Sequence, residues 1–160
     1  MAYRGYGASD GRPSEAALTE DAVAVLDHAA SCHGAPVDVI GRSLGSAVAM
    51  QVAVRRTIGE LVLVTPFDSA VAVSKFHLPW FPAGWLLADQ WDSEAAAPRV
   101  RARTLVVSAG RDTVIPGQLT DRLVAAFASS PQVLHLPDRE HNDVADDPGF
   151  WPTVADFLGA

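Results

Sequence analysis

The chain has 160 residues, of which 49% are hydrophobic and 19% are charged, an ordinary composition for a globular domain. Its formal net charge of −7 and sequence pI near 5.0 disfavour nucleic acid and anionic membrane surfaces as partners. No apolar run reaches the roughly 18 residues of a membrane span, the N-terminus lacks the apolar stretch of a secretory signal, and the single cysteine, Cys32, excludes an internal disulfide. We therefore expect one domain, residues 1–160, in the cytoplasm.

The elements that the sequence predicts alternate between helices and strands. A loop over 1–13 is followed by Ser14, which caps a helix that ends near Gly34. Short apolar runs predict strands at 37–40, 60–66, 104–110 and 132–137, and helical spacing predicts helices at 44–56, 118–129 and 148–158. This alternation predicts an α/β fold, with a mostly parallel sheet of about four strands flanked by helices. Segment 67–98 is an insert with aromatic residues among prolines and few charges.

A serine stands between two glycines where the first predicted strand turns into a helix, in the sequence "VIGRSLGSAVA". In this setting the G-x-S-x-G pattern lifts the serine hydroxyl clear of the sheet on a tight, strained turn. The N–H of Leu44, at the start of the following helix, then points toward an anion that forms beside Ser43. The alternative interpretation is a glycine-rich turn with an incidental serine.

A serine hydroxyl needs a base and an orienting carboxylate to act as a nucleophile. Of the five histidines, His141 alone follows the last predicted strand, at the edge where the strands should end. Two carboxylates, Asp68 and Asp112, each come just past a strand. The order Ser43, Asp112, His141 is the order used by sheets of this type, so we favour Asp112 and expect Asp68 to line a pocket or cap a helix.

Together these segments resemble the α/β-hydrolase superfamily, in its esterase, lipase and serine-peptidase-like branch. The matching segments span nearly the whole chain: "YRGYGASDGRPSE", "VIGRSLGSAVA", "LVTPFDS", "AGRDTVIP" and "EHNDV". The resemblance implies that Ser43 is the nucleophile, His141 the general base and then acid, and Asp112 the residue that orients His141. It also implies that Leu44 supplies an oxyanion N–H and that segment 67–98 is a short lid. The aromatic residues of that lid then form either an acyl-binding wall or ordinary core packing.

The resemblance further implies a truncated α/β-hydrolase fold, because "YRGYG" follows the fourth strand in the family but begins at residue 3 here. The family's second oxyanion donor comes from a loop after the third strand, and the loss of such a donor costs about 10²–10³ in turnover. We therefore expect reduced activity. The family's strand order also leaves the strand at Val37–Ile40 as an open edge, so we expect a homo-oligomer or poor behaviour alone.

The leading hypothesis is thus a serine hydrolase that cleaves a carboxylic ester, a thioester or an amide through an acyl-enzyme intermediate. Arg42, Phe67 and Trp80 are the expected substrate-binding residues beside Leu44. No cofactor is expected, and no metal site, because the spacing around Cys32 and in "HND" matches no ligand pattern. The alternatives are a non-catalytic binding or scaffold protein and an inactive fragment of a longer hydrolase. The expected partner is a small ester-type molecule.

Overall fold

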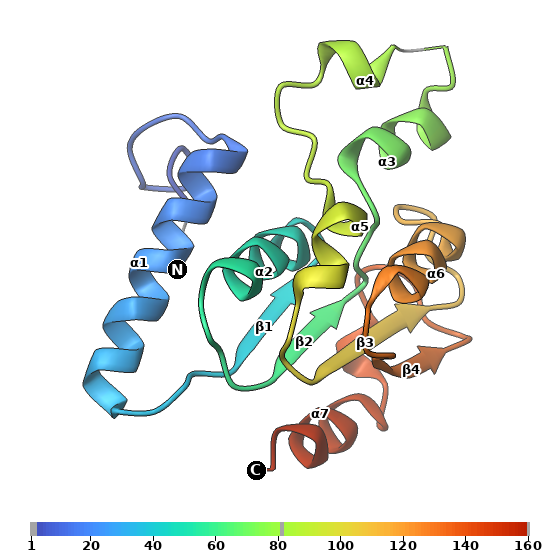
Figure 1. Cartoon of the computed structure of the whole chain (residues 1–160). Coiled ribbons are helices and arrows are strands. Elements are labelled where there is room, and N and C mark those ends of the chain that lie inside the picture. Colours follow the sequence, from blue (N-terminus) through green and yellow to red (C-terminus); the bar gives the residue numbers. More distant parts are fainter. Residues whose placement is uncertain (1–2, 81, 160) are drawn as a thin grey trace.

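The computed structural model describes residues 3–80 and 82–159. Within them a single sheet contains four parallel strands in the order β1-β2-β3-β4. The strands are β1 (Val39–Arg42), β2 (Leu61–Val64), β3 (Thr104–Ala109) and β4 (Gln132–Leu136). The prediction of a parallel sheet flanked by helices is therefore confirmed, with strand ends that differ by one or two residues from those expected (Figure 1).

Helix α1 precedes the first strand, and the other helices lie between or after the strands. They are α1 (Glu15–His33), α2 (Leu44–Arg55), α3 (Ala70–His77), α4 (Ala83–Leu86), α5 (Ser93–Ala96), α6 (Gly117–Ala126) and α7 (Phe150–Leu158), with short 3-10 turns η1 (Ala97–Arg99) and η2 (Val144–Asp146). Helix α1 begins as its sequence predicts, because the Ser14 hydroxyl accepts a hydrogen bond from the Ala17 N–H at 3.2 Å. It ends at Gly34, whose φ of 67° suits a residue without a side chain.

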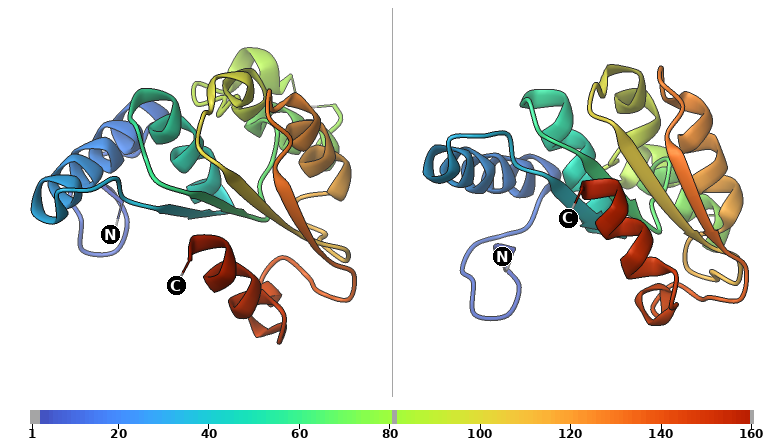
Figure 2. Two further views of the ribbon diagram at one scale, coloured as in Figure 1. Left: turned by 60° about the horizontal axis from the view of Figure 1, so that its bottom comes forward. Right: turned by 90° about the horizontal axis from the view of Figure 1, so that it is seen from below.

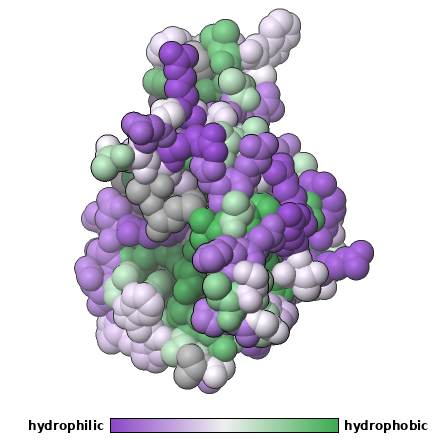
Figure 3. Space-filling view, turned by 90° about the vertical axis from the view of Figure 1, so that its left-hand side faces the viewer, coloured by the Kyte–Doolittle hydropathy of each residue, from purple (hydrophilic) through white to green (hydrophobic). Residues whose placement is uncertain are grey.

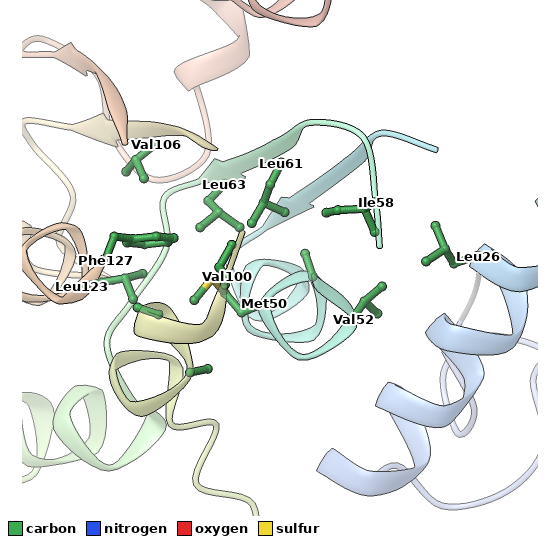
Figure 4. Close-up of a cluster of buried hydrophobic side chains, with 13 residues drawn as sticks. Leu26, Met50, Val52, Ile58, Leu61, Leu63, Val100, Val106, Leu123 and Phe127 are labelled. Carbon is green, nitrogen blue, oxygen red and sulfur yellow. The ribbon is translucent and has the colours of Figure 1, made fainter. Parts of the chain in front are cut away.

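Two apolar layers enclose the sheet because successive side chains of a strand point to opposite faces. Leu61 and Leu63 face α2 and α6, in a core that also includes Met50 and Phe127 (Figure 4). Val62 and Val64 face the other way, against α7. Figure 2 shows α7 on one face of the sheet and α2, α5 and α6 on the other, with α1 outside α2.

The insert between β2 and β3 contains three short helices, α3, α4 and α5. Helices α3 and α4 project past the ends of the strands, at the top of Figure 1. Among the described residues, no helix combines the length and the apolar character that a membrane crossing requires. Because α3 and α4 lie past the carboxyl ends of the strands, the insert is at the same edge of the sheet as Ser43 and His141.

Candidate active site

Ser43 occupies the turn between β1 and α2. Its φ of 51° and ψ of −121° are unusual for a residue with a side chain, and such strain is concentrated at functional sites. The Ser43 N–H donates to the carbonyl of Val64 on the neighbouring strand at 2.9 Å, which fixes the turn to the sheet. The Leu44 N–H is the first of α2 and has no carbonyl partner within the helix, so it is available beside the hydroxyl.

Gly41, two residues before Ser43, is required because the turn packs closely against helix α2. A Cβ at Gly41 would clash with the carbonyl oxygen of Gly45 and would lie 2.7 Å from the Cβ of Ala49. A Cβ at Gly45 would meet only the hydroxyl of Tyr3, at 3.4 Å. The two glycines of the motif are therefore unequal, since Gly41 alone allows the helix to lie this close to the strand.

The structure brings the Ser43, His141 and Asp112 side chains together. His141 Nε2 lies 3.0 Å from Ser43 Oγ, and His141 Nδ1 lies 2.7 Å from Asp112 Oδ2. An ionised carboxylate can only accept hydrogen bonds, so the Nδ1 position carries the proton. Nε2 is then the acceptor for the serine hydroxyl, which is the arrangement that proton abstraction from Ser43 requires.

Asp112 is held by its own loop, immediately after β3. Its Oδ1 accepts hydrogen bonds from the N–H groups of Val114 and Ile115 at 2.8 and 2.7 Å, and its Oδ2 remains for His141. The side chain of Asp112 is 3% exposed and that of His141 9%. Low exposure strengthens the hydrogen bond between them, because water does not compete for either group.

The His141 loop is braced from two sides by contacts that the sequence does not reveal. Arg42 Nη2 donates to the His141 carbonyl and to Asn142 Oδ1, both at 3.0 Å. On the other side, Arg139 Nε donates to Asp147 Oδ2 at 3.0 Å. Hydrogen bonds from the Gly149 N–H and from Arg139 lower the pKa of Asp147, so this carboxylate keeps its charge well into acid.

One of these braces gives Arg42 a role that the sequence did not predict. The expected contact of Arg42 with substrate stays a prediction, while its guanidinium is seen to hold the loop that carries His141. No sequence signal indicates this role, because the partner is 99 residues away.

Asp68 lies apart from His141, as expected of a residue that lines a pocket. It is buried and accepts hydrogen bonds from the Ser69 N–H at 2.6 Å and from Arg122 Nε at 2.7 Å. It also lines a cavity of about 480 Å³ between α3 and α6. A second serine–histidine pair is formed by the half-buried Ser108 of β3 and the exposed His135 of β4, with 2.9 Å between Oγ and Nδ1.

The aromatic residues of the insert do not form one wall. Phe67 and Trp91 are buried in a core cluster with Val48 and Leu119, so Phe67 packs the core rather than a substrate. Trp80 and Trp85 are 79% and 95% exposed on the projecting part of the insert. Phe81 falls outside the described residues. Of the two interpretations of the insert aromatics, core packing holds for Phe67, while Trp80 faces solvent, so these two residues do not form one acyl-binding wall.

Across the residues that the structure describes, no group of three or more histidine, cysteine, aspartate or glutamate side chains gathers in a way that would hold a metal ion.

Comparisons with known proteins agree with this architecture. A family model described as "Alpha/beta hydrolase family" matches residues 1–158. The uncharacterized protein Rv2307c of Mycobacterium tuberculosis is 41% identical over 144 residues, which are 88% of this chain and 51% of that protein. The chain thus spans about half the length of the curated relatives it matches.

Solved structures share the fold. A hydrolase from Pseudomonas aeruginosa superposes with a TM-score of 0.73 at 24% identity, over 99% of this chain and 78% of that one. A monoacylglycerol lipase from Paleococcus ferrophilus gives a TM-score of 0.71 at 17% identity, over 98% of this chain and 80% of that one. At these identities the likeness shows a common fold.

Proposed function

Because the chain belongs to the alpha/beta hydrolase family, we propose that it is a serine hydrolase that cleaves a carboxylic ester, a thioester or an amide. The observation that carries the proposal is the unbroken pair of hydrogen bonds from Ser43 Oγ through His141 to Asp112.

In the proposed reaction, Ser43 Oγ attacks the carbonyl carbon of the substrate while His141 Nε2 takes the hydroxyl proton. Asp112 stabilises the imidazolium that forms and keeps Nε2 directed at the serine. The Leu44 N–H donates to the negative oxygen of the tetrahedral intermediate. His141 then gives the proton to the leaving alcohol, thiol or amine, and the acyl group stays on Ser43.

Hydrolysis of the acyl-enzyme repeats these steps with water as the nucleophile. His141 removes a proton from the water, the oxygen attacks the acyl carbon, and Ser43 leaves with the proton that His141 returns. No additional reactant is needed, because water is the only other substrate.

A fluorophosphonate probe tests whether the hydroxyl is activated. We expect labelling at Ser43 and hydrolysis of a p-nitrophenyl ester of a short acid, with both lost in Ser43→Ala and in His141→Ala. Changes within one catalytic unit are non-additive, so the double variant should be no worse than either single variant.

Ser108→Ala is the matched control, since Ser108 also contacts a histidine but no carboxylate contact with His135 is found among the described residues. It should leave labelling and turnover unchanged. A folded protein that is not labelled, or that hydrolyses the ester as well after Ser43→Ala, would favour the alternative of a non-catalytic binding protein.

A further inference from the structure

A second cavity lies at the opposite end of the sheet from Ser43. It has a volume of about 840 Å³, within the usual size of a small-molecule site. Two segments form it: residues 53–58, at the end of α2 and in the loop before β2, and residues 98–102, between α5 and β3. Both loops lie where β2 and β3 begin, in the lower half of Figure 1 above α7, whereas Ser43, Asp112 and His141 follow the ends of strands.

Positive charge dominates this cavity. Its lining includes four arginines and no carboxylate: Arg55, Arg56, Arg99 and Arg101. The whole chain has 12 lysines and arginines against 19 acidic residues, so a third of its cationic side chains gather around one cavity of a protein with net charge −7. We refer to it below as the arginine cavity.

Ion pairing within the protein accounts for only one of these arginines. Arg56 donates to both carboxylate oxygens of Asp27, from Nε at 2.8 Å and from Nη2 at 2.9 Å. For Arg55, Arg99 and Arg101, no carboxylate partner is found among the described residues. The four arginine side chains are exposed, so water and salt weaken the repulsion between them, and a bound anion would remove what is left of it.

The dipole of α2 explains part of the cluster. Cationic side chains are favoured at the carboxyl end of a helix, which suits Arg55 in the last turn and Arg56 at the C-cap. Arg99 and Arg101 come from a different part of the chain, about 45 residues further on. Arg99 ends only the three-residue turn η1, so no dipole like that of the 12-residue α2 accounts for these two arginines. Their convergence on the same cavity is therefore an independent feature.

We propose that the arginine cavity binds an anion that carries two or more phosphate groups. A guanidinium presents paired N–H donors that match two phosphate oxygens, which a point charge such as lysine does not. Thr57 adds a neutral hydroxyl to the lining, and Ile58 is buried beneath it. The class includes free pyrophosphate, nucleoside diphosphates and the phosphorylated headgroup of an inositol lipid. The site is separate from the catalytic one and does not depend on the proposed hydrolase activity.

The proposal is tested by titrating the protein with inorganic pyrophosphate and with a nucleoside diphosphate at near-physiological salt. Binding is measured by calorimetry and by the midpoint of thermal unfolding. We expect saturable binding with a Kd below about 1 mM, equivalent to about 4 kcal/mol, and a raised unfolding midpoint. Arg99→Gln combined with Arg101→Gln should weaken binding at least tenfold.

The matched control replaces Arg12 and Lys75 with glutamine, which removes the same charge from two exposed residues elsewhere. Binding by this control should equal that of the wild type. Two results would overturn the proposal. One is the absence of saturable binding by the wild type. The other is an equal loss of affinity in the control, which would indicate that any positive charge on the protein attracts the anion. If the glutamine variant is unfolded, Arg99→Lys with Arg101→Lys keeps the charge and should still weaken binding; unchanged affinity there would contradict recognition by guanidinium pairs.

Vesicles distinguish the source of the phosphate. Sedimentation with phosphatidylcholine vesicles that contain phosphatidylinositol 4-phosphate, and release by free pyrophosphate, would assign a lipid headgroup to the arginine cavity. Binding of soluble diphosphates without sedimentation would assign a free ligand. Both outcomes support the site and separate its two sources.

Discussion

The guanidinium of Arg42 binds the backbone of His141: its Nη2 donates to the His141 carbonyl at 3.0 Å across 99 positions of sequence. Arg42 is also the residue directly before Ser43. One side chain therefore links the turn that carries the proposed nucleophile to the loop that carries its proposed base.

This contact predicts a positioning role for Arg42. In Arg42→Ala the His141 loop loses one of its braces, and a small displacement of the imidazole should lower kcat about 10- to 100-fold with little change in KM. Arg42→Lys should recover part of kcat, because an ammonium reaches the same carbonyl. Steady-state kinetics on an ester check the split. A rise in KM at unchanged kcat would instead assign Arg42 to substrate binding.

The two glycines around Ser43 predict opposite effects on stability. In Gly41→Ala the new Cβ meets the Gly45 carbonyl, so the free energy of unfolding should fall by about 1–3 kcal/mol. In Gly45→Ala the Cβ has room, and alanine favours the first turn of α2 by up to about 1 kcal/mol over glycine. Urea unfolding of both variants measures the contrast. Equal loss in the two would contradict the packing seen at Gly41.

The low pKa of Asp147 predicts how acid affects the His141 loop. A folded-state pKa below the usual value of 3.8 means that the contribution to stability is complete above pH 3.8, shrinks as the pH falls toward the folded pKa, and is absent below it. Asp147→Asn should therefore be less stable than the wild type near pH 7, and the two should converge in strong acid. Unfolding midpoints measured from pH 7 to pH 2 check this. A constant difference at every pH would show that charge is not responsible.

The edge of β1 predicts self-association. Within the described sheet β1 pairs with β2 alone, and Ile40 is 52% exposed on the face that α7 covers elsewhere. Beside this edge an apolar groove of about 260 Å³ runs between α1 and β1 (Figure 3). We expect two copies to pair through this edge, because identical edges are self-complementary about a two-fold axis.

Size-exclusion chromatography with light scattering across a range of protein concentrations tests this expectation. Ile40→Lys should shift the protein toward monomer, since a charge on an edge strand opposes pairing. Val133→Lys on the other edge strand, β4, is the control, because Val133 is exposed to a similar extent. A wild type that stays monomeric at high concentration would contradict the expectation.

Local features of the site could be predicted because they depend on short stretches of sequence. Alternating apolar runs and helical spacing indicated each strand and long helix to within a few residues. Ser43, Asp112 and His141 each come after the end of a strand (β1, β3 and β4), which indicated their meeting, since parallel strands direct their carboxyl ends to one edge of the sheet.

The insert could not be predicted in the same way. Phe67 and Trp80 are both aromatic and lie in a segment without regular spacing, and only the folded chain separates the buried one from the exposed one. Burial depends on which helices pack nearby, and those helices come from other parts of the sequence.

The sequence by itself thus determined the family, the order of elements and the three polar side chains that meet at the end of the sheet. Only the tertiary structure decided how the His141 loop is held, by Arg42 on its backbone and by Arg139 with Asp147. It also decided that four arginines line one cavity at the other end of the sheet. The physical reason is range. Hydrophobic spacing and turn geometry act over a few neighbouring residues. A hydrogen bond such as that from Arg42 to His141 joins residues 99 positions apart that only folding brings to 3.0 Å.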